Sequence, residues 1–89
     1  MLQEIADALR KNTTWRLIIQ GHTDNVGGDA FNMDLSQRRS EAVRAALIGR
    51  FAIDGQRLAT AGFGASKPKQ SNNTSEGRAE NRRVELVRQ

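Results

Sequence analysis

The chain of 89 residues contains no cysteine and no tyrosine, and it has only one proline, one tryptophan and one histidine. Without cysteine the protein can form neither a disulfide nor a thiolate metal site. Aromatic residues make up 4% of the chain and apolar residues 37%, so its hydrophobic core must be aliphatic and small. We therefore expect a single small domain over residues 1–89, with a narrow margin of stability.

Features needed for membrane insertion or export are also missing. No apolar run is long enough to span a bilayer. The first residues, Met1 to Glu4, include an acid where a signal peptide has a basic segment, and no long apolar stretch follows. We expect no direct membrane insertion by this segment. If the protein acts outside the cytoplasm, its export signal or anchor lies outside this chain.

The residues required for common catalytic and cofactor sites are absent as well. His22 is the only histidine, and no cysteine accompanies it at metal-ligand spacing. Ser36 and Ser40 lie in no Gly-x-Ser-x-Gly motif, and Gly62-x-Gly64 is too short for a dinucleotide-binding loop. We therefore expect no enzyme, no catalytic residue, no metal and no cofactor. His22 is assigned a structural hydrogen bond at the end of a strand.

The net charge of +4 comes mostly from arginine, and it is compatible with binding nucleic acid, binding an anionic surface or simple solubility. The best case for nucleic acid is a group of C-terminal arginines: Arg78, Arg82, Arg83 and Arg88. Glutamates lie between them without any aromatic platform, and Arg82 and Arg83 would point to opposite faces of a strand. A basic nucleic-acid-binding domain is thus the alternative function, and we expect no nucleic acid partner.

Hydrophobic periodicity and turn residues indicate alternating helices and strands. In chain order, we expect a helix over 2–11, a strand over 15–20, a polar loop over 21–34, a helix from 36 to about 51, a strand over 57–62, a long loop to 74, a short helix over 75–80 and a strand over 82–87. Ser36 is the expected N-cap of the second helix. The order α-β-α-β-(α)-β predicts an α/β (α+β) sandwich with helices packed on a small mixed sheet.

Two charged residues flank the polar loop. Asp24 follows the first strand in a loop that we expect to be too polar to bury it, and Arg39 falls in the first turn of the next helix. Taken alone, Asp24 is most simply an Asx-turn or helix-cap residue, and Arg39 a surface arginine. Together they can face each other across a gap, because the loop brings a strand end close to a helix start.

A fixed acid and a fixed base that are kept apart suit a zwitterionic ligand. The carboxylate would bind an ammonium group and the guanidinium a carboxylate, through charge-assisted hydrogen bonds worth about 1.5–3 kcal/mol each. The competing interpretation is a direct salt bridge between Asp24 and Arg39. Such a bridge, or burial of either side chain, would remove the physical basis for binding.

The same loop and helix carry a family resemblance. The stretch Gly21-His22-Thr23-Asp24-Asn25, Gly27, and the run from Asn32 to Ser40 resemble the signature of the OmpA-like C-terminal domain. Further matches follow in register: Arg57-Leu58, Gly62-Phe63-Gly64, Pro68, Asn73-Thr74 and Gly77 to Glu85. The resemblance covers essentially the whole chain. The same module is found in outer-membrane porins, the peptidoglycan-associated lipoprotein and the flagellar stator protein.

The resemblance implies a function and a set of site residues. In this family the domain binds peptidoglycan non-covalently by holding the diaminopimelate of the stem peptide. Asp24 matches the acid that holds the diaminopimelate amine, and Arg39 the arginine that holds its carboxylate. Other matching positions line the pocket (Asn32 and Arg82) or shape its walls (Thr23, Asn25 and Leu35). The implied location is periplasmic, with attachment to the outer membrane or cell envelope through parts outside this chain.

The sequence departs from the family pattern at two points. Ser40 replaces the usual alanine after the helix arginine, a small and harmless change. The family domain also begins with a strand before its first helix, whereas this chain starts inside that helix, as if truncated at its N-terminus. An incomplete sheet leaves backbone groups unpaired at an edge. We therefore expect a homodimer or strand exchange more readily than for a complete domain.

Overall fold

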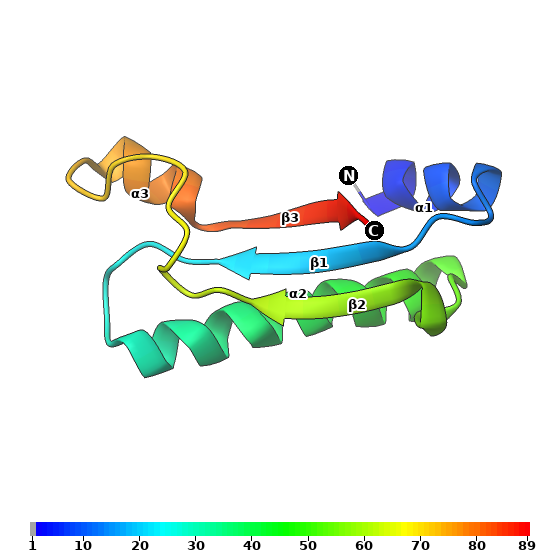
Figure 1. The fold of residues 1–89 in the computed structure, drawn as a ribbon, viewed down its shortest axis with the longest axis horizontal. Helices are drawn as coiled ribbons and strands as arrows, with labels where there is room; N and C mark the ends of the chain where they lie inside the picture. The colour runs from blue at the N-terminus through cyan, green and yellow to red at the C-terminus, as the bar shows by residue number, and fades with distance from the viewer. Residues whose placement is uncertain (1) are drawn as a thin grey trace.

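The computed structural model describes residues 2–89 and confirms the expected fold class. Its elements in chain order are α1 (Leu2–Lys11), β1 (Leu17–His22), α2 (Asp29–Phe51), the 3-10 helix η1 (Gly55–Arg57), β2 (Leu58–Gly62), α3 (Ser75–Asn81) and β3 (Arg83–Arg88) (Figure 1). The long helix α2 runs along the sheet, while α3 lies at one end of the molecule and α1 at the other. None of the helices within residues 2–89 is both long and apolar enough to cross a membrane.

The sheet has three strands in the order β2-β1-β3. Strand β1 is parallel to β2, because α2 carries the chain back to the starting edge, and it is antiparallel to β3. The sheet is therefore mixed, as expected. Since β1 is the central strand, its C-terminal end meets the segments that follow β2 and precede β3.

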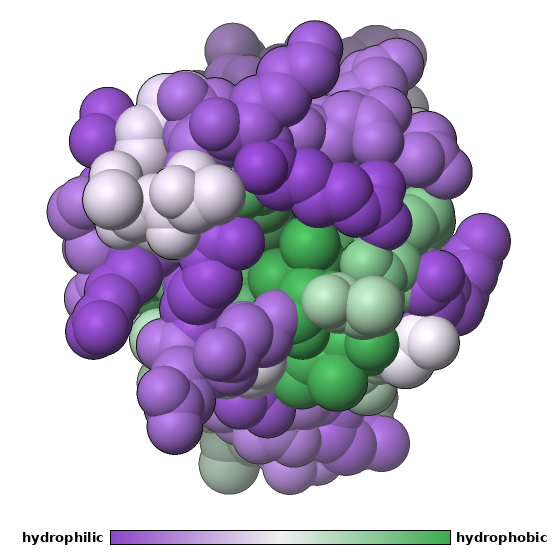
Figure 2. All heavy atoms as spheres, turned by 90° about the vertical axis from the view of Figure 1, so that its right-hand side faces the viewer, coloured by the Kyte–Doolittle hydropathy of each residue, from purple (hydrophilic) through white to green (hydrophobic). Residues whose placement is uncertain are grey.

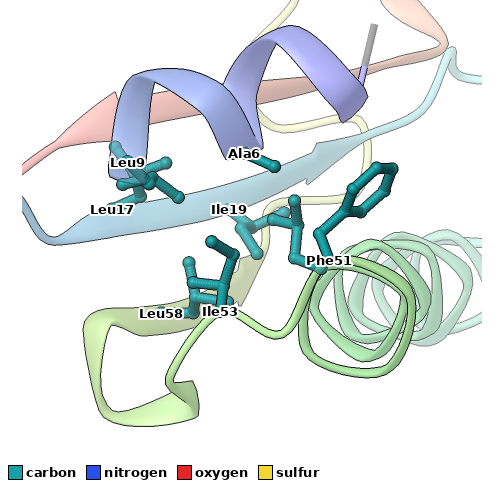
Figure 3. Packing of buried hydrophobic residues seen from close by; sticks show 8 residues of the cluster. Ala6, Leu9, Leu17, Ile19, Phe51, Ile53 and Leu58 are labelled. Atoms are coloured by element: carbon teal, nitrogen blue, oxygen red, sulfur yellow. The ribbon is translucent and has the colours of Figure 1, made fainter. Parts of the chain in front are cut away.

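The core is aliphatic and lies between one face of the sheet and helices α1 and α2. Leu17 and Ile19 project from β1 toward this layer, as their alternation predicts. Figure 3 shows them beside Ala6 and Leu9 of α1 and next to Phe51 of α2. The buried apolar cluster is completed by Leu47, Ile53 and Leu58.

The core is not fully closed at one end of the molecule. Figure 2 shows an apolar area surrounded by polar side chains at the end where α1, the end of β3 and the last turn of α2 meet. Apolar side chains that pack only partly against the core include Leu2, Ile5, Val84 and Leu86. Strand β3 pairs with β1 on one side and with no strand of residues 2–89 on the other. The described part of the chain thus has a narrow sheet with a free edge at β3.

Arginine side chains connect elements that contribute little to the core. The Arg57 guanidinium donates hydrogen bonds to three backbone carbonyls, those of Leu9, Asn12 and Trp15, at 2.8, 2.8 and 3.1 Å. These bonds tie the end of α1 and the entry into β1 to the start of β2. Carbonyl groups at the end of a helix lack partners within the helix, and Arg57 supplies donors to this segment.

The expected start of α2 is wrong. The helix begins at Asp29, with Gly28 as N-cap and no side-chain cap, so Ser36 lies inside it. The first turns have an inverted pattern, because Asn32 is buried whereas Phe31 and Met33 are about half exposed. Because the buried position is polar and its neighbours are apolar, the hydrophobic residues of this segment do not recur with the period of a helix. The segment therefore resembles a loop in sequence although it is helical.

Helix α2 touches the sheet through two glycines that pair across β1 and β2. A Cβ at Gly21 would lie 2.1 Å from the backbone oxygen of Ser36, and one at Gly62 would lie 2.6 Å from the backbone nitrogen of Gln37. Gly21 and Gly62 are register partners in the sheet. The Ser36 hydroxyl, fully buried at this contact, accepts a hydrogen bond from the Gly64 N–H at 2.9 Å. Only the absence of side chains at both positions lets the helix approach so closely.

His22 ends β1 on the opposite face of the sheet and is 1% exposed. Its ring stacks on Phe63 with centroids 5.3 Å apart. Its Nε2 lies 3.2 Å from a carboxylate oxygen of Glu85, yet neither ring nitrogen makes a hydrogen bond within residues 2–89. The expected hydrogen bond is therefore wrong for the described residues, and the structural role of His22 stays a prediction. Burial and the Arg83 charge lower the pKa of His22, while Glu85 acts in the opposite direction and Lys67 adds to the lowering.

The close contact of α2 with Gly21 predicts that adding a methyl group at this position destabilises the fold, whereas adding one at an open glycine does not. We expect Gly21→Ala to lower the free energy of unfolding by about 1–3 kcal/mol or more, because the new Cβ clashes with helix backbone that cannot rotate away. The matched control is Gly49→Ala, since Gly49 lies in α2 and a Cβ added there would meet nothing within 4 Å. That change should stabilise the helix by about 0.5–1 kcal/mol. Urea unfolding followed by circular dichroism measures both, and equal effects would contradict the packing described.

The environment of His22 predicts a pH dependence of stability. Because the unfolded chain takes up a proton near the ordinary pKa of 6.5 and the folded chain resists it, stability is full above pH 6.5 and falls as the pH drops below it. The slope is at most about 1.4 kcal/mol per pH unit. His22→Phe, which retains the stacked ring, should flatten the slope between pH 7 and 5 in thermal unfolding. An unchanged slope in this variant would show that other groups cause it.

Candidate functional site

Asp24 lies just beyond the end of β1, and both of its carboxylate oxygens are engaged. One oxygen accepts the Val26 N–H at 3.0 Å, and the other accepts Arg82 Nη1 at 2.7 Å. The first bond confirms the Asx-turn interpretation. The expectation that the loop leaves Asp24 unburied is wrong, because the residue is only 7% exposed. Burial of either charge was the stated condition that removes the simple basis for binding, in which a free acid and a free base hold a zwitterion, so that account is wrong in its original form. Its carboxylate is satisfied by one hydrogen bond from the loop backbone and one from Arg82.

Asp24 remains charged despite its burial. Burial raises the pKa of Asp24, but the hydrogen bonds from Arg82 and Val26 and the charges of Arg82 and Arg78 lower it by more. The pKa of this carboxyl therefore lies below its ordinary value of 3.8. At neutral pH Asp24 and Arg82 form an ion pair in which the acid is buried and the guanidinium is about half exposed.

Two further predicted site residues hold this loop in place. The hydroxyl of the buried Thr23 donates a hydrogen bond to the Asp24 carbonyl at 2.8 Å. The Asn32 amide, 2% exposed, donates to the carbonyls of Val26 and Asp24 at 3.1 and 3.4 Å. Both side chains thus fix the backbone around Asp24. A direct contact of either with a ligand remains a prediction.

Arg82 is positioned by Asn81, which was not among the predicted site residues. Asn81 is completely buried, and its side chain binds the backbone of Lys69 and Gln70 and the side chain of Asn72 at 2.8–2.9 Å. The Arg82 N–H bonds the Arg78 carbonyl at the end of α3. In the sequence, the only signal for this role was an asparagine at the junction of a predicted short helix and a predicted strand. The hydrogen bonds of Asn81 fix the backbone position from which the Arg82 side chain reaches Asp24.

Arg39 lies in the interior of α2, not in its first turn as expected, because the helix begins earlier. It is exposed and makes no hydrogen bond or ion pair within residues 2–89. Arg39 and Arg82 both line an open cleft of about 610 Å³, together with Val43, Arg83 and Val84. The structure therefore brings these two arginines to one cleft. It contains no Asp24–Arg39 salt bridge within residues 2–89, since the partner of Asp24 is Arg82.

The charge of this site differs from the simple pair expected from the sequence. Asp24, Arg82 and Arg39 carry one negative and two positive charges, and only Arg39 lacks a partner among the described residues. The cleft is thus suited to bind a carboxylate between two guanidinium groups. Asn25 is exposed in the loop and Leu35 is half-buried on α2. Neither lines the cleft, and their predicted roles as pocket walls are not tested by this arrangement.

Three of the C-terminal arginines are engaged by other groups of the fold. Arg83 is paired with Glu85 and also donates to the Lys67 carbonyl. Arg78 donates to the Asn72 carbonyl, and the Arg88 guanidinium stacks on the Trp15 ring at 4.6 Å. These groups are engaged internally at different ends of β3, and the absence of a nucleic acid partner stays a prediction. No group of three potential metal ligands occurs within residues 2–89.

Sequence comparison identifies the relatives of this chain. A family model described as the OmpA family matches residues 1–82. Outer membrane porin F of Pseudomonas aeruginosa is 43% identical over 84 residues, which is 94% of this chain and 24% of the porin. The peptidoglycan-binding protein ArfA of Mycobacterium tuberculosis is 42% identical over 87 residues, which is 98% of this chain and 26% of that protein. The chain spans about a quarter of the length of these relatives.

Solved structures share the fold. The peptidoglycan-associated lipoprotein of Burkholderia pseudomallei superposes with a TM-score of 0.92 at 34% identity, covering 99% of this chain and 74% of that one. The cell wall anchor of the type VI secretion system of Pseudomonas aeruginosa has a TM-score of 0.81 at 37% identity, covering 96% of this chain and 61% of the anchor. These likenesses cover the elements that carry Asp24, Arg39 and Arg82.

Proposed function

Because the chain belongs to the OmpA family, we propose that it binds peptidoglycan non-covalently and anchors an envelope protein to the cell wall. Relatives and structural neighbours that are named as peptidoglycan-binding, peptidoglycan-associated or cell wall anchor proteins support this proposal. The role is binding without catalysis. The place of action is the periplasm, since relatives include outer membrane proteins. Attachment to the outer membrane or envelope would come from parts of the protein outside this chain.

The observation that carries the proposal is the cleft shared by Arg39 and Arg82, with the ion-paired Asp24 behind Arg82. We infer that this cleft receives the diaminopimelate of a stem peptide. The free end of that residue carries one ammonium and one carboxylate group. The guanidinium groups match the carboxylate through charge-assisted, forked hydrogen bonds, and Asp24 is the nearby acid for the ammonium.

Binding at a single site should be modest in strength, because the end of one amino acid offers few contacts. Firm attachment then arises from many copies of the domain on a polymeric ligand. Each additional contact becomes effectively intramolecular once the first has formed. A shallow, open cleft is therefore compatible with an anchoring role.

Arg39→Ala is the most direct test of this assignment. Arg39 is exposed and without a partner among residues 2–89, so its removal should leave the free energy of unfolding unchanged within about 0.5 kcal/mol. We expect it to abolish co-sedimentation with purified peptidoglycan. The same loss is expected for Asp24→Ala, although this variant also breaks the pair with Arg82. Arg38→Ala is the matched control, because Arg38 is the neighbouring arginine and pairs only with Asp34 on the surface.

A separate experiment tests whether the ligand is diaminopimelate. Peptidoglycan in which lysine replaces diaminopimelate lacks the second carboxylate, and we expect the wild-type protein not to co-sediment with it. Retention of Arg39→Ala on diaminopimelate peptidoglycan would refute the site. Equal retention of the wild-type protein on both polymers would leave wall binding in place and refute the specificity.

The homodimer expected from the sequence also remains a proposal. The outer edge of β3 has no partner strand among residues 2–89, and a second copy of the chain can pair there edge to edge. We expect sedimentation equilibrium to detect reversible dimers that Val87→Lys weakens, because Val87 is exposed on β3 and a charge at an edge opposes pairing. A monomer at all concentrations would refute the proposal.

A further inference from the structure

The outer edge of β2 faces an open cleft instead of another strand. On its inner side β2 pairs with β1, and no strand within residues 2–89 pairs with its outer side. The cleft has a volume of about 680 Å³ and lies between residues 58–60 of the strand and the side of α2 that carries Arg44 and Gly49. A Cβ added at Gly49 would meet nothing within 4 Å, so the helix side of the cleft is open. A strand that added to β2 would have to lie here.

A row of polar side chains on α2 reaches across this cleft to the strand. Gln37, Glu41 and Arg44 are spaced three or four residues apart, so they share one side of the helix. The Gln37 amide donates hydrogen bonds to the Thr60 hydroxyl and to the Glu41 carboxylate, both at 3.0 Å. Thr60 is the middle residue of β2. The row therefore contacts the edge halfway along the strand.

Arg44 covers the beginning of the edge. Its Nε donates to the Leu58 carbonyl at 3.0 Å, and its Nη2 donates to the Gly55 carbonyl at 2.9 Å. Both acceptors are backbone groups, at the first residue of β2 and at the start of η1. Arg44 is half-buried and forms no ion pair within residues 2–89. Its guanidinium group is thus used on main-chain carbonyls at the side where an added strand would pair.

We propose that Arg44 and Gln37 close the β2 edge to strand pairing, and that the partner which they exclude is the same edge of a second copy of the chain. The backbone N–H and C=O groups of an edge strand match those of another extended main chain. Two β2 strands that paired antiparallel about a two-fold axis would form one continuous sheet from two copies. With β2 closed, the sheet can gain a strand only at β3. This inference does not depend on wall binding.

Arg44 fills the space that an added strand would need. Neighbouring strands run about 4.7–4.9 Å apart, whereas Arg44 Nε lies only 3.0 Å from the Leu58 oxygen and lines the cleft. An incoming strand must therefore displace the guanidinium group and exchange its charge-assisted hydrogen bonds for neutral backbone ones, which are weaker. Each charge-assisted bond lost corresponds to a factor of about ten or more in the association constant. A leucine at this position makes no such bonds and carries no charge.

The test uses a chain that carries Val87→Lys, in which a charge blocks the β3 edge. Arg44→Leu is introduced into this chain, and self-association is measured by sedimentation equilibrium. We expect the association constant to rise at least about tenfold. Arg38→Leu is the matched control, because Arg38 lies on the same helix and pairs only with Asp34 on the surface. The inference is overturned if Arg44→Leu produces no rise, or if the control produces an equal one.

Hydrogen–deuterium exchange locates the surface through which the variant associates. In the chain with Arg44→Leu and Val87→Lys, the amides of β2 should exchange more slowly at high protein concentration than at low concentration, because their outer groups become paired. The amides of β3 should show no such dependence. Slower exchange in β3 alone would mean that the copies meet at the other edge, and it would overturn the inference.

A further measurement needs no variant and so does not depend on the folding of Arg44→Leu. In the wild-type protein the Nε–H of Arg44 is bonded to a backbone carbonyl, whereas Arg39 on the same helix is exposed and makes no hydrogen bond within residues 2–89. We expect NMR to show that the Arg44 Nε–H exchanges with water more slowly than the Arg39 Nε–H. Equal exchange rates would show that Arg44 does not hold the edge, and they would overturn the inference.

Discussion

The geometry of the site depends on how closely α2 lies on the sheet. Gly21 and Gly62, paired across β1 and β2, leave a flat surface on which the backbone of α2 rests at Ser36 and Gln37. The buried Ser36 hydroxyl binds the segment that follows β2. This contact fixes the helix both along and across the sheet. Asn32 lies one turn before this contact and Arg39 one turn after it. The contact therefore positions both the Asn32 amide, which binds the loop carbonyls, and Arg39, which lines the cleft.

Much of the arginine content serves the fold rather than a charged surface. Arg57 joins three backbone carbonyls from α1 and the entry into β1, and Arg44 donates to the carbonyls of Leu58 and Gly55 beside the outer edge of β2. Arg83 and Arg88 are held by a carboxylate and an aromatic ring. In a small domain with few aromatic residues, such connections supplement a limited core. Part of the net charge of +4 is therefore carried by side chains that hold the fold together.

Elements were predicted correctly from the sequence where the apolar residues are the buried ones. The prediction failed where a polar residue is buried and its apolar neighbours are exposed. The alternation at Leu17 and Ile19 and the periodicity of residues 2–11 identified β1 and α1, because burial follows the repeat of the element there. The start of α2 was missed, since Asn32 is buried for its hydrogen bonds to the loop and not for hydrophobicity. The pairing of Asp24 with Arg82 rather than Arg39 depends on β3 lying beside β1, a tertiary contact that no local pattern contains.

The side chain of Asn81 has a consequence for comparing related chains. It closes the segment from Lys69 to Asn72 back onto the start of β3 through four hydrogen bonds. An insertion or deletion within that segment would therefore break the bonds or move the origin of the neighbouring arginine away from the acid. The number of residues between Lys69 and Asn81, together with an asparagine at its end, is thus a practical criterion for deciding whether an aligned homologue retains the same cleft or only the same fold.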